Sequence, residues 1–117
     1  MSLIELSNNR LASGSYHQRV HIWNVLEKDI TLLKILRTPG HFVASVFNLS
    51  QNRIAACSGD KVITLWQSEE PYEEIKLMKL EEGAHTAIQL KDKDVLVVSS
   101  SSSSLDFWNL NSFEYQP

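Results

Sequence analysis

The stretch that decides the fold is IAACSGDKVITLW, residues 54–66. Two related stretches flank it: LASGSYHQRVHIW at residues 11–23 and VVSSSSSSLDFW at residues 97–108. Each stretch ends on a tryptophan, and these tryptophans lie 43 and 42 residues apart: Trp23, Trp66 and Trp108. A repeat of about 40–45 residues in which a tryptophan closes a strand is typical of β-propeller blades.

The repetition extends upstream of these stretches. Residues 2–15, SLIELSNNRLASGS, align with residues 45–58, SVFNLSQNRIAACS, at an offset of 43. Residues 86–99, TAIQLKDKDVLVVS, form a third copy at an offset of 41 from the second. Because the third tryptophan lies at an offset of 42, we expect one inserted residue in the serine run of this copy.

Each copy has the pattern of four short strands separated by polar turns, which favours an all-β fold. Strand one ends near Leu6, Leu49 and Leu90. We expect strand two at 11–13, 54–56 and 95–98, strand three at 20–25, 62–67 and 105–110, and strand four at 32–36 and 75–80. The predicted fold is a partial β-propeller of about three four-stranded antiparallel blades, at residues 1–38, 39–82 and 83–117.

Strand three of the middle copy is apolar on both sides. Val62, Thr64 and Trp66 project to one side of the sheet, and Ile63 and Leu65 project to the other. A sheet with one wet face would alternate apolar and polar residues. We therefore expect both faces of the middle blade to be covered by neighbouring blades.

Three blades are fewer than a closed ring needs, since propellers typically have about 4–8 blades. Uncapped repeat units leave apolar faces open. The expected fold is therefore incomplete: a fragment of a larger propeller, a truncated product, or one part of a ring that is completed by self-association.

The middle copy resembles the WD-repeat family at Gly40-His41, Ser58, Asp60 and Trp66. In that family a Gly-His pair precedes strand one, a serine lies in strand two, an aspartate precedes strand three, and a tryptophan ends strand three. The resemblance implies a buried hydrogen-bonded set running from carboxylate to imidazole to hydroxyl to indole. The other copies retain fewer of these residues: Trp23 in the first, and His85 and Trp108 in the third, with His17 and Ser102 at the aspartate position.

The same resemblance implies a non-catalytic scaffold that binds other proteins or peptides through its loops. The family's contact positions correspond to Tyr16, Ser45, Gly59, Thr86 and Ser101. The alternative is a substrate-recruiting or regulatory segment of a larger multidomain enzyme, such as a ubiquitin ligase or a kinase. Further blades in the same chain, or a second copy, are additional candidate partners.

No catalytic, metal or cofactor motif is present in the sequence. His17 and His21 lie in a turn and a strand and so share no helical face, and Cys57 has no CxxC partner. There is no GxSxG, GxGxxG or P-loop pattern. We therefore expect no enzyme activity, no metal and no cofactor.

Composition and charge limit the expected partners and the expected cellular location. The 117-residue chain has a net charge of −3 and scattered basic residues, so nucleic-acid binding is not expected. It has one cysteine, no signal-peptide pattern and no apolar run near the ~20 residues that span a bilayer, so we expect a cytoplasmic or nuclear protein away from membranes.

Two segments have an unusual composition. Residues 69–74 are expected to form a solvated acidic loop. Residues 99–104 read as a strand end and turn, with phosphorylation as the alternative.

Overall fold

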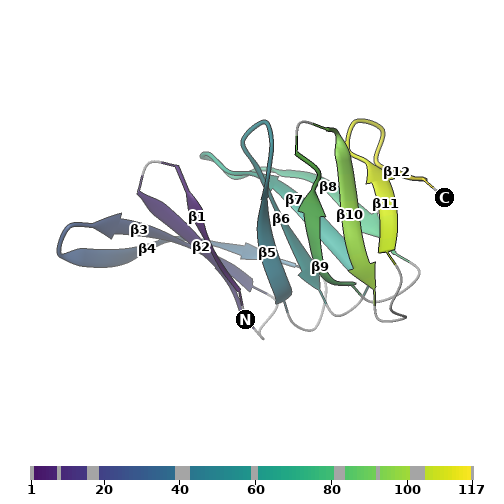
Figure 1. Cartoon of the computed structure of the whole chain (residues 1–117). Coiled ribbons are helices and arrows are strands. Elements are labelled where there is room, and N and C mark those ends of the chain that lie inside the picture. Colours follow the sequence, from purple (N-terminus) through teal and green to yellow (C-terminus); the bar gives the residue numbers. More distant parts are fainter. Residues whose placement is uncertain are drawn as a thin grey trace.

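The computed structural model describes residues 2–7, 9–15, 19–38, 43–58, 61–80, 84–91, 93–100 and 105–116. These ranges form an all-β structure of three four-stranded antiparallel sheets, without a helix (Figure 1). The sheets follow one another along the chain, and each pairs its strands in sequence order. The expected architecture, a partial propeller of three blade-like sheets, is confirmed.

The first blade consists of β1 (Leu3–Leu6), β2 (Arg10–Gly14), β3 (Arg19–Leu26) and β4 (Asp29–Arg37). The second blade consists of β5 (Val43–Leu49), β6 (Arg53–Ser58), β7 (Val62–Gln67) and β8 (Glu74–Lys79). The third blade consists of β9 (Ala84–Gln89), β10 (Val95–Ser100), β11 (Leu105–Asn109) and β12 (Glu114–Gln116). The sequence pattern did not locate β12, because three residues are too short a run to show an alternation.

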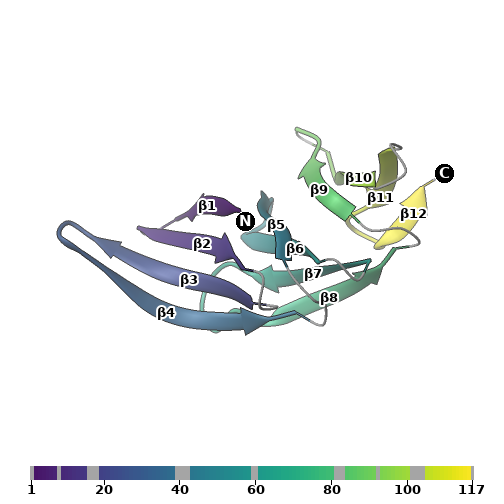
Figure 2. The same cartoon turned by 90° about the horizontal axis from the view of Figure 1, so that it is seen from below.

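The blades stand side by side with their first strands on a common inner side. Figure 2 shows β1, β5 and β9 on this inner side, and β4, β8 and β12 on the outer side. Strand β5 contacts both β1 and β9, and so links the three blades at their inner edge. The second blade lies between the other two (Figure 1).

The turns between strands one and two show the repeat at backbone level. In the first and second blades three residues connect the paired positions Leu6–Arg10 and Leu49–Arg53. The last residue of each connection is left-handed, Asn9 with φ 60° and Asn52 with φ 55°. Asparagine is one of the few residues that adopts this conformation readily.

The third copy carries its extra residue in this turn, so its expected position in the serine run is wrong. Gln89 pairs with Leu96, whereas the corresponding Asn48 pairs with Ile54, so the third blade has one more residue between the partners. The pairing from strand two to strand three is unchanged, since Ile54–Trp66 and Leu96–Trp108 have equal spacing. A longer polar turn accommodates an insertion without moving side chains to the other face of the sheet.

The middle blade is buried on both faces, as its strand pattern predicted. All six residues of β6 and the first five of β7 are buried. Ile54, Ala56 and Trp66 join a core cluster with the first blade. Residues on the other face join a core cluster with the third blade: Phe47, Ala55, Ile63 and Leu65.

A single packing rule describes both clusters. We call the side of a blade that carries its strand-three tryptophan the Trp face, and the other side the back face. In each cluster the Trp face of the later blade packs against the back face of the earlier blade. The back face of the first blade contributes Ile4, Ala12, Val20 and Ile22, and the Trp face of the third contributes Ala87, Leu96 and Trp108.

Candidate functional site

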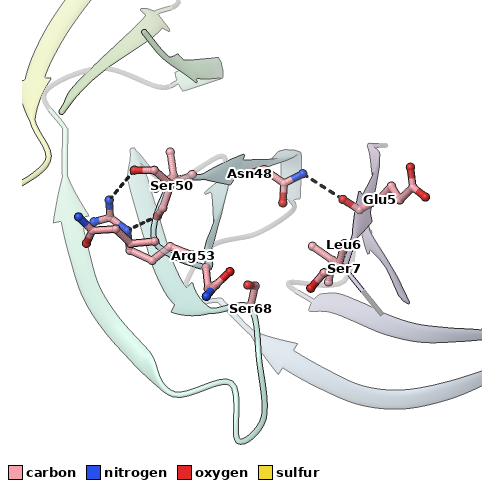
Figure 3. Close-up of a pocket in the computed structure, with 10 residues that line it drawn as sticks. Glu5, Leu6, Ser7, Asn48, Ser50, Arg53 and Ser68 are labelled. Carbon is pink, nitrogen blue, oxygen red and sulfur yellow. Dashed lines mark hydrogen bonds between the residues drawn. The ribbon is translucent and has the colours of Figure 1, made fainter. Parts of the chain in front are cut away.

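Side-chain amides join neighbouring blades at the end where strand one turns into strand two. Asn48 in β5 donates from Nδ2 to the Glu5 carbonyl of the first blade at 3.0 Å (Figure 3). Gln89 occupies the corresponding position in β9, where its Oε1 accepts from the Ser50 backbone N–H at 2.8 Å and its Nε2 donates to Ser50 Oγ at 2.9 Å. In each case a strand-one amide reaches back to the preceding blade.

A cavity of about 300 Å³ opens between the first and second blades at this end. Its walls are the two strand-one to strand-two turns, together with the amide of Asn48 and the side chains of Arg53 and Ser68 (Figure 3). The polar groups around it are neutral except for Glu5 and Arg53. Such a lining suits hydrogen bonds to a peptide backbone and provides no nucleophile paired with a base.

An arginine side chain stabilises the turn between strands one and two in the first and second blades. Arg10 and Arg53 are only 8% and 7% exposed, and each donates from Nε to the carbonyl three residues upstream, Ser7 at 3.2 Å and Ser50 at 2.8 Å. Arg10 also donates from its guanidinium to the hydroxyl of Tyr72, which lies in the β7–β8 loop of the second blade. Its guanidinium carbon lies 5.6 Å from the centroid of the Tyr72 ring.

The acidic loop is therefore only partly solvated. Glu69, Glu70, Glu73 and Glu74 are exposed as expected, but Tyr72 among them is 4% exposed and belongs to the core cluster between the first two blades. Sequence reasoning missed Arg10 and Tyr72 as a pair because 62 residues separate them. The only available signal was the alignment of Arg10 with Arg53 in the repeat.

Replacing Tyr72 with phenylalanine is expected to lower the free energy of unfolding by about 1–3 kcal/mol, because it removes the acceptor of a buried charged donor. Urea unfolding of Tyr72→Phe, Arg10→Met and the double variant measures the coupling. A double variant that costs clearly less than the sum of the single variants is expected. Strictly additive losses would contradict a direct interaction between these side chains.

The predicted partner-contact residues occupy different environments. Ser45, in β5, pairs across the strands with Cys57, and its hydroxyl oxygen is buried, so it does not face solvent. Thr86, in β9, is exposed. The other three predicted contacts lie outside the described residues and remain predictions: Tyr16, Gly59 and Ser101.

The predicted hydrogen-bonded set is described in part. Ser58 donates from Oγ to the Val62 carbonyl at 3.2 Å, and Trp66 is 3% exposed in the core. A bond between an indole and a hydroxyl occurs in the first blade, where Trp23 Nε1 donates to Ser13 Oγ at 3.0 Å. Trp108 packs against the core cluster of the third blade. The predicted partners His41 and Asp60, and the side chain of His85, lie outside the described residues.

Cys57 is a buried core thiol. Burial raises its pKa from the ordinary 9.0 to about 12, while the nearby Ser45 hydroxyl opposes this rise to a smaller extent. A thiol with this pKa is ionised in roughly one molecule in ten thousand at pH 8. Because the thiolate is the reactive form, Cys57 is suited to packing rather than to nucleophilic chemistry.

Cys57 is expected to make the chain less stable as the pH rises above 9. The unfolded chain releases the thiol proton near pH 9, whereas the folded chain retains it up to about pH 12. Unfolding is therefore favoured by about 1.4 kcal/mol for each pH unit in this window. Urea unfolding at pH 8, 9, 10 and 11 measures the slope. Cys57→Ala is the control and should show a shallower slope; parallel slopes would contradict the raised pKa.

Among the described residues, no group of three or more His, Cys, Asp or Glu side chains could hold a metal ion. The described ranges also contain no helix with the length and hydropathy that a bilayer-crossing helix requires.

The fold and these contacts define a class of protein: an all-β chain of repeated blade-like sheets, joined by apolar faces and by hydrogen bonds from side-chain amides. In comparisons with known proteins, no protein-family model and no curated protein sequence matched the chain.

Proposed function

We propose that the chain is a non-catalytic scaffold of the WD-repeat type that binds other proteins or peptides. One observation carries this proposal: the same packing of a Trp face on a back face joins all three blades into one frame. A frame of this kind holds its connecting turns at fixed positions, and binding residues in proteins are often placed on such turns.

The proposed binding end is the one where strand two turns into strand three. There, Ser15 and Ser58, which are equivalent in the repeat, donate to the carbonyls of Arg19 and Val62, each at 3.2 Å. Each bond joins the end of strand two to the start of strand three in its blade. The predicted contact positions Tyr16 and Gly59 follow these serines directly in the sequence.

A second cavity lies at this end of the first blade. Its volume is about 400 Å³, and its walls include Leu3, Gly14 and His21 together with three serines: Ser2, Ser13 and Ser15. A partly apolar cavity lined by serine residues fits one apolar side chain of a peptide and hydrogen bonds to the peptide backbone. The proposed partner is therefore a peptide segment or loop of another protein.

Site-specific photo-crosslinking tests this proposal. A photoreactive side chain at position 16 is expected to capture a partner protein from cell extract. The same group at Lys28, an exposed residue in the β3–β4 turn at the opposite end of the first blade, is the matched control. Tyr16→Ala should then weaken binding of the purified partner by roughly tenfold or more, since aromatic residues often dominate binding energy. Equal capture at both positions, or unchanged affinity, would reject this binding end.

A further inference from the structure

Among the residues that the structure describes, two sheet faces lack a neighbouring blade. The Trp face of the first blade carries Leu3, Leu11 and Trp23, which correspond to Val46, Ile54 and Trp66 in the second. Leu3 is 65% exposed, whereas Val46 is 4% exposed because the first blade covers it.

The back face of the third blade is the second uncovered face. It carries Ile88, Val97, Leu105 and Phe107, which correspond to Phe47, Ala55, Ile63 and Leu65 in the second blade. Ile88 is 60% exposed and Leu105 is 62% exposed, whereas Phe47 and Ile63 are buried under the third blade. The third blade therefore has an open back face, and the first blade an open Trp face.

These are the two halves of the joint that already occurs twice within the chain. We propose that a second copy of this chain covers them head to tail, with the Trp face of its first blade on the back face of the third blade. Each copy has one face of each kind, so two copies form two identical joints. The resulting ring has six blades, within the range of about 4–8 blades found in closed propellers.

Charges also favour a second copy, at the position where Asn48 and Gln89 join neighbouring blades within the chain. Glu5 corresponds to Asn48 and Gln89, the residues that reach back to the preceding blade. Its side chain points away from the second blade (Figure 3) and is exposed. Lys91 corresponds to Ser50 at the repeat offset of 41, and Ser50 is the residue that Gln89 binds.

In the proposed joint a carboxylate therefore meets an ammonium group where the internal joint has an amide and a hydroxyl. Glu5 and Lys91 have opposite charges, so the uncovered faces complement one another in charge as well as in apolar character. The proposal rests on the blade faces and does not need the peptide-binding function proposed above. The two occupants exclude one another on the first blade, because Leu3 lies on its Trp face and also lines the second cavity.

Sedimentation equilibrium of the purified chain measures the association. A species of twice the 13.3 kDa chain mass is expected at micromolar concentration. Leu3→Arg blocks only the first-blade face and Ile88→Arg only the third-blade face; both residues are more than half exposed, so the monomer fold should persist, as checked by circular dichroism. Each variant alone is expected to be monomeric, and an equimolar mixture is expected to recover dimer through its one unaltered joint.

The charge pair provides a second measurement. Glu5→Lys and Lys91→Glu should each weaken association by roughly fivefold to tenfold, and the double variant should restore it to within about threefold, because the exchanged charges attract again. A wild-type monomer up to millimolar concentration would overturn the proposal and assign the faces to other blades or another protein. A dimer lost in Leu3→Arg but unchanged in Ile88→Arg would also overturn it, because that pattern indicates two first blades meeting face to face.

Discussion

Replacing Trp66 with alanine is expected to lower the free energy of unfolding by about 3–5 kcal/mol. The indole is 3% exposed and lies in the core cluster between the first two blades. Its removal leaves a void in a joint whose walls are sheets that cannot collapse far without breaking strand pairing. Urea unfolding followed by far-UV circular dichroism measures the loss.

Trp23→Ala is the matched control, because Trp23 has the same position in the repeat and lies on an uncovered face. It is half-buried and donates to Ser13, so its loss should be clearly smaller, about 1 kcal/mol in the monomer. The comparison is made at protein concentrations where the chain is monomeric. Equal losses at the two positions would indicate that the faces do not pack as described.

Ile63→Ala is expected to destabilise the chain by about 2–5 kcal/mol. Ile63 is fully buried in the joint between the second and third blades, where it packs in one cluster with Leu96 and Val98. If the alanine variant does not fold, Ile63→Val should still cost about 0.5–1.5 kcal/mol.

The control for Ile63 is the same change at Ile30, near the tip of the β3–β4 hairpin. Ile30 is 60% exposed, and truncation of an exposed strand residue usually changes stability by less than about 0.5 kcal/mol. A small effect at Ile63, or equal effects at the two positions, would contradict burial of the middle blade on both faces.

Both predictions follow from a feature that the sequence pattern already contained. Strands β6 and β7 are apolar at successive positions, and side chains alternate between the two faces of a strand. A run without alternating polar residues therefore predicts that both faces of the blade are buried, and the repeat supplies a neighbouring blade for each face. The structure agrees because side-chain direction within a strand is a local property of the backbone.

The position of the extra residue in the third copy was predicted wrongly for a related reason. Alignment by residue identity placed it in the serine run, where six identical residues make any register equally good. The paired positions Gln89–Leu96 place it in the preceding turn. Register depends on which side chains each strand must bury, and a serine run carries no such preference.

The candidate site was predictable only in outline. The repeat predicted the positions of the turns and of the serines. It did not predict the amide hydrogen bonds of Asn48 and Gln89 or the bond between Arg10 and Tyr72. These groups belong to different blades, and their separation in space depends on the stacking of the sheets. No local pattern reports that distance.

The sequence by itself determined the three-fold repeat, the strand pattern within each copy and the two-sided burial of the middle copy, because strand formation and side-chain alternation are local. Only the tertiary structure decided which polar groups meet between blades and which faces remain open. The packing of one blade on the next sets these contacts: it covers Val46 and leaves the equivalent Leu3 exposed. Two residues with the same place in the repeat differ in burial because only one of them has a neighbouring blade.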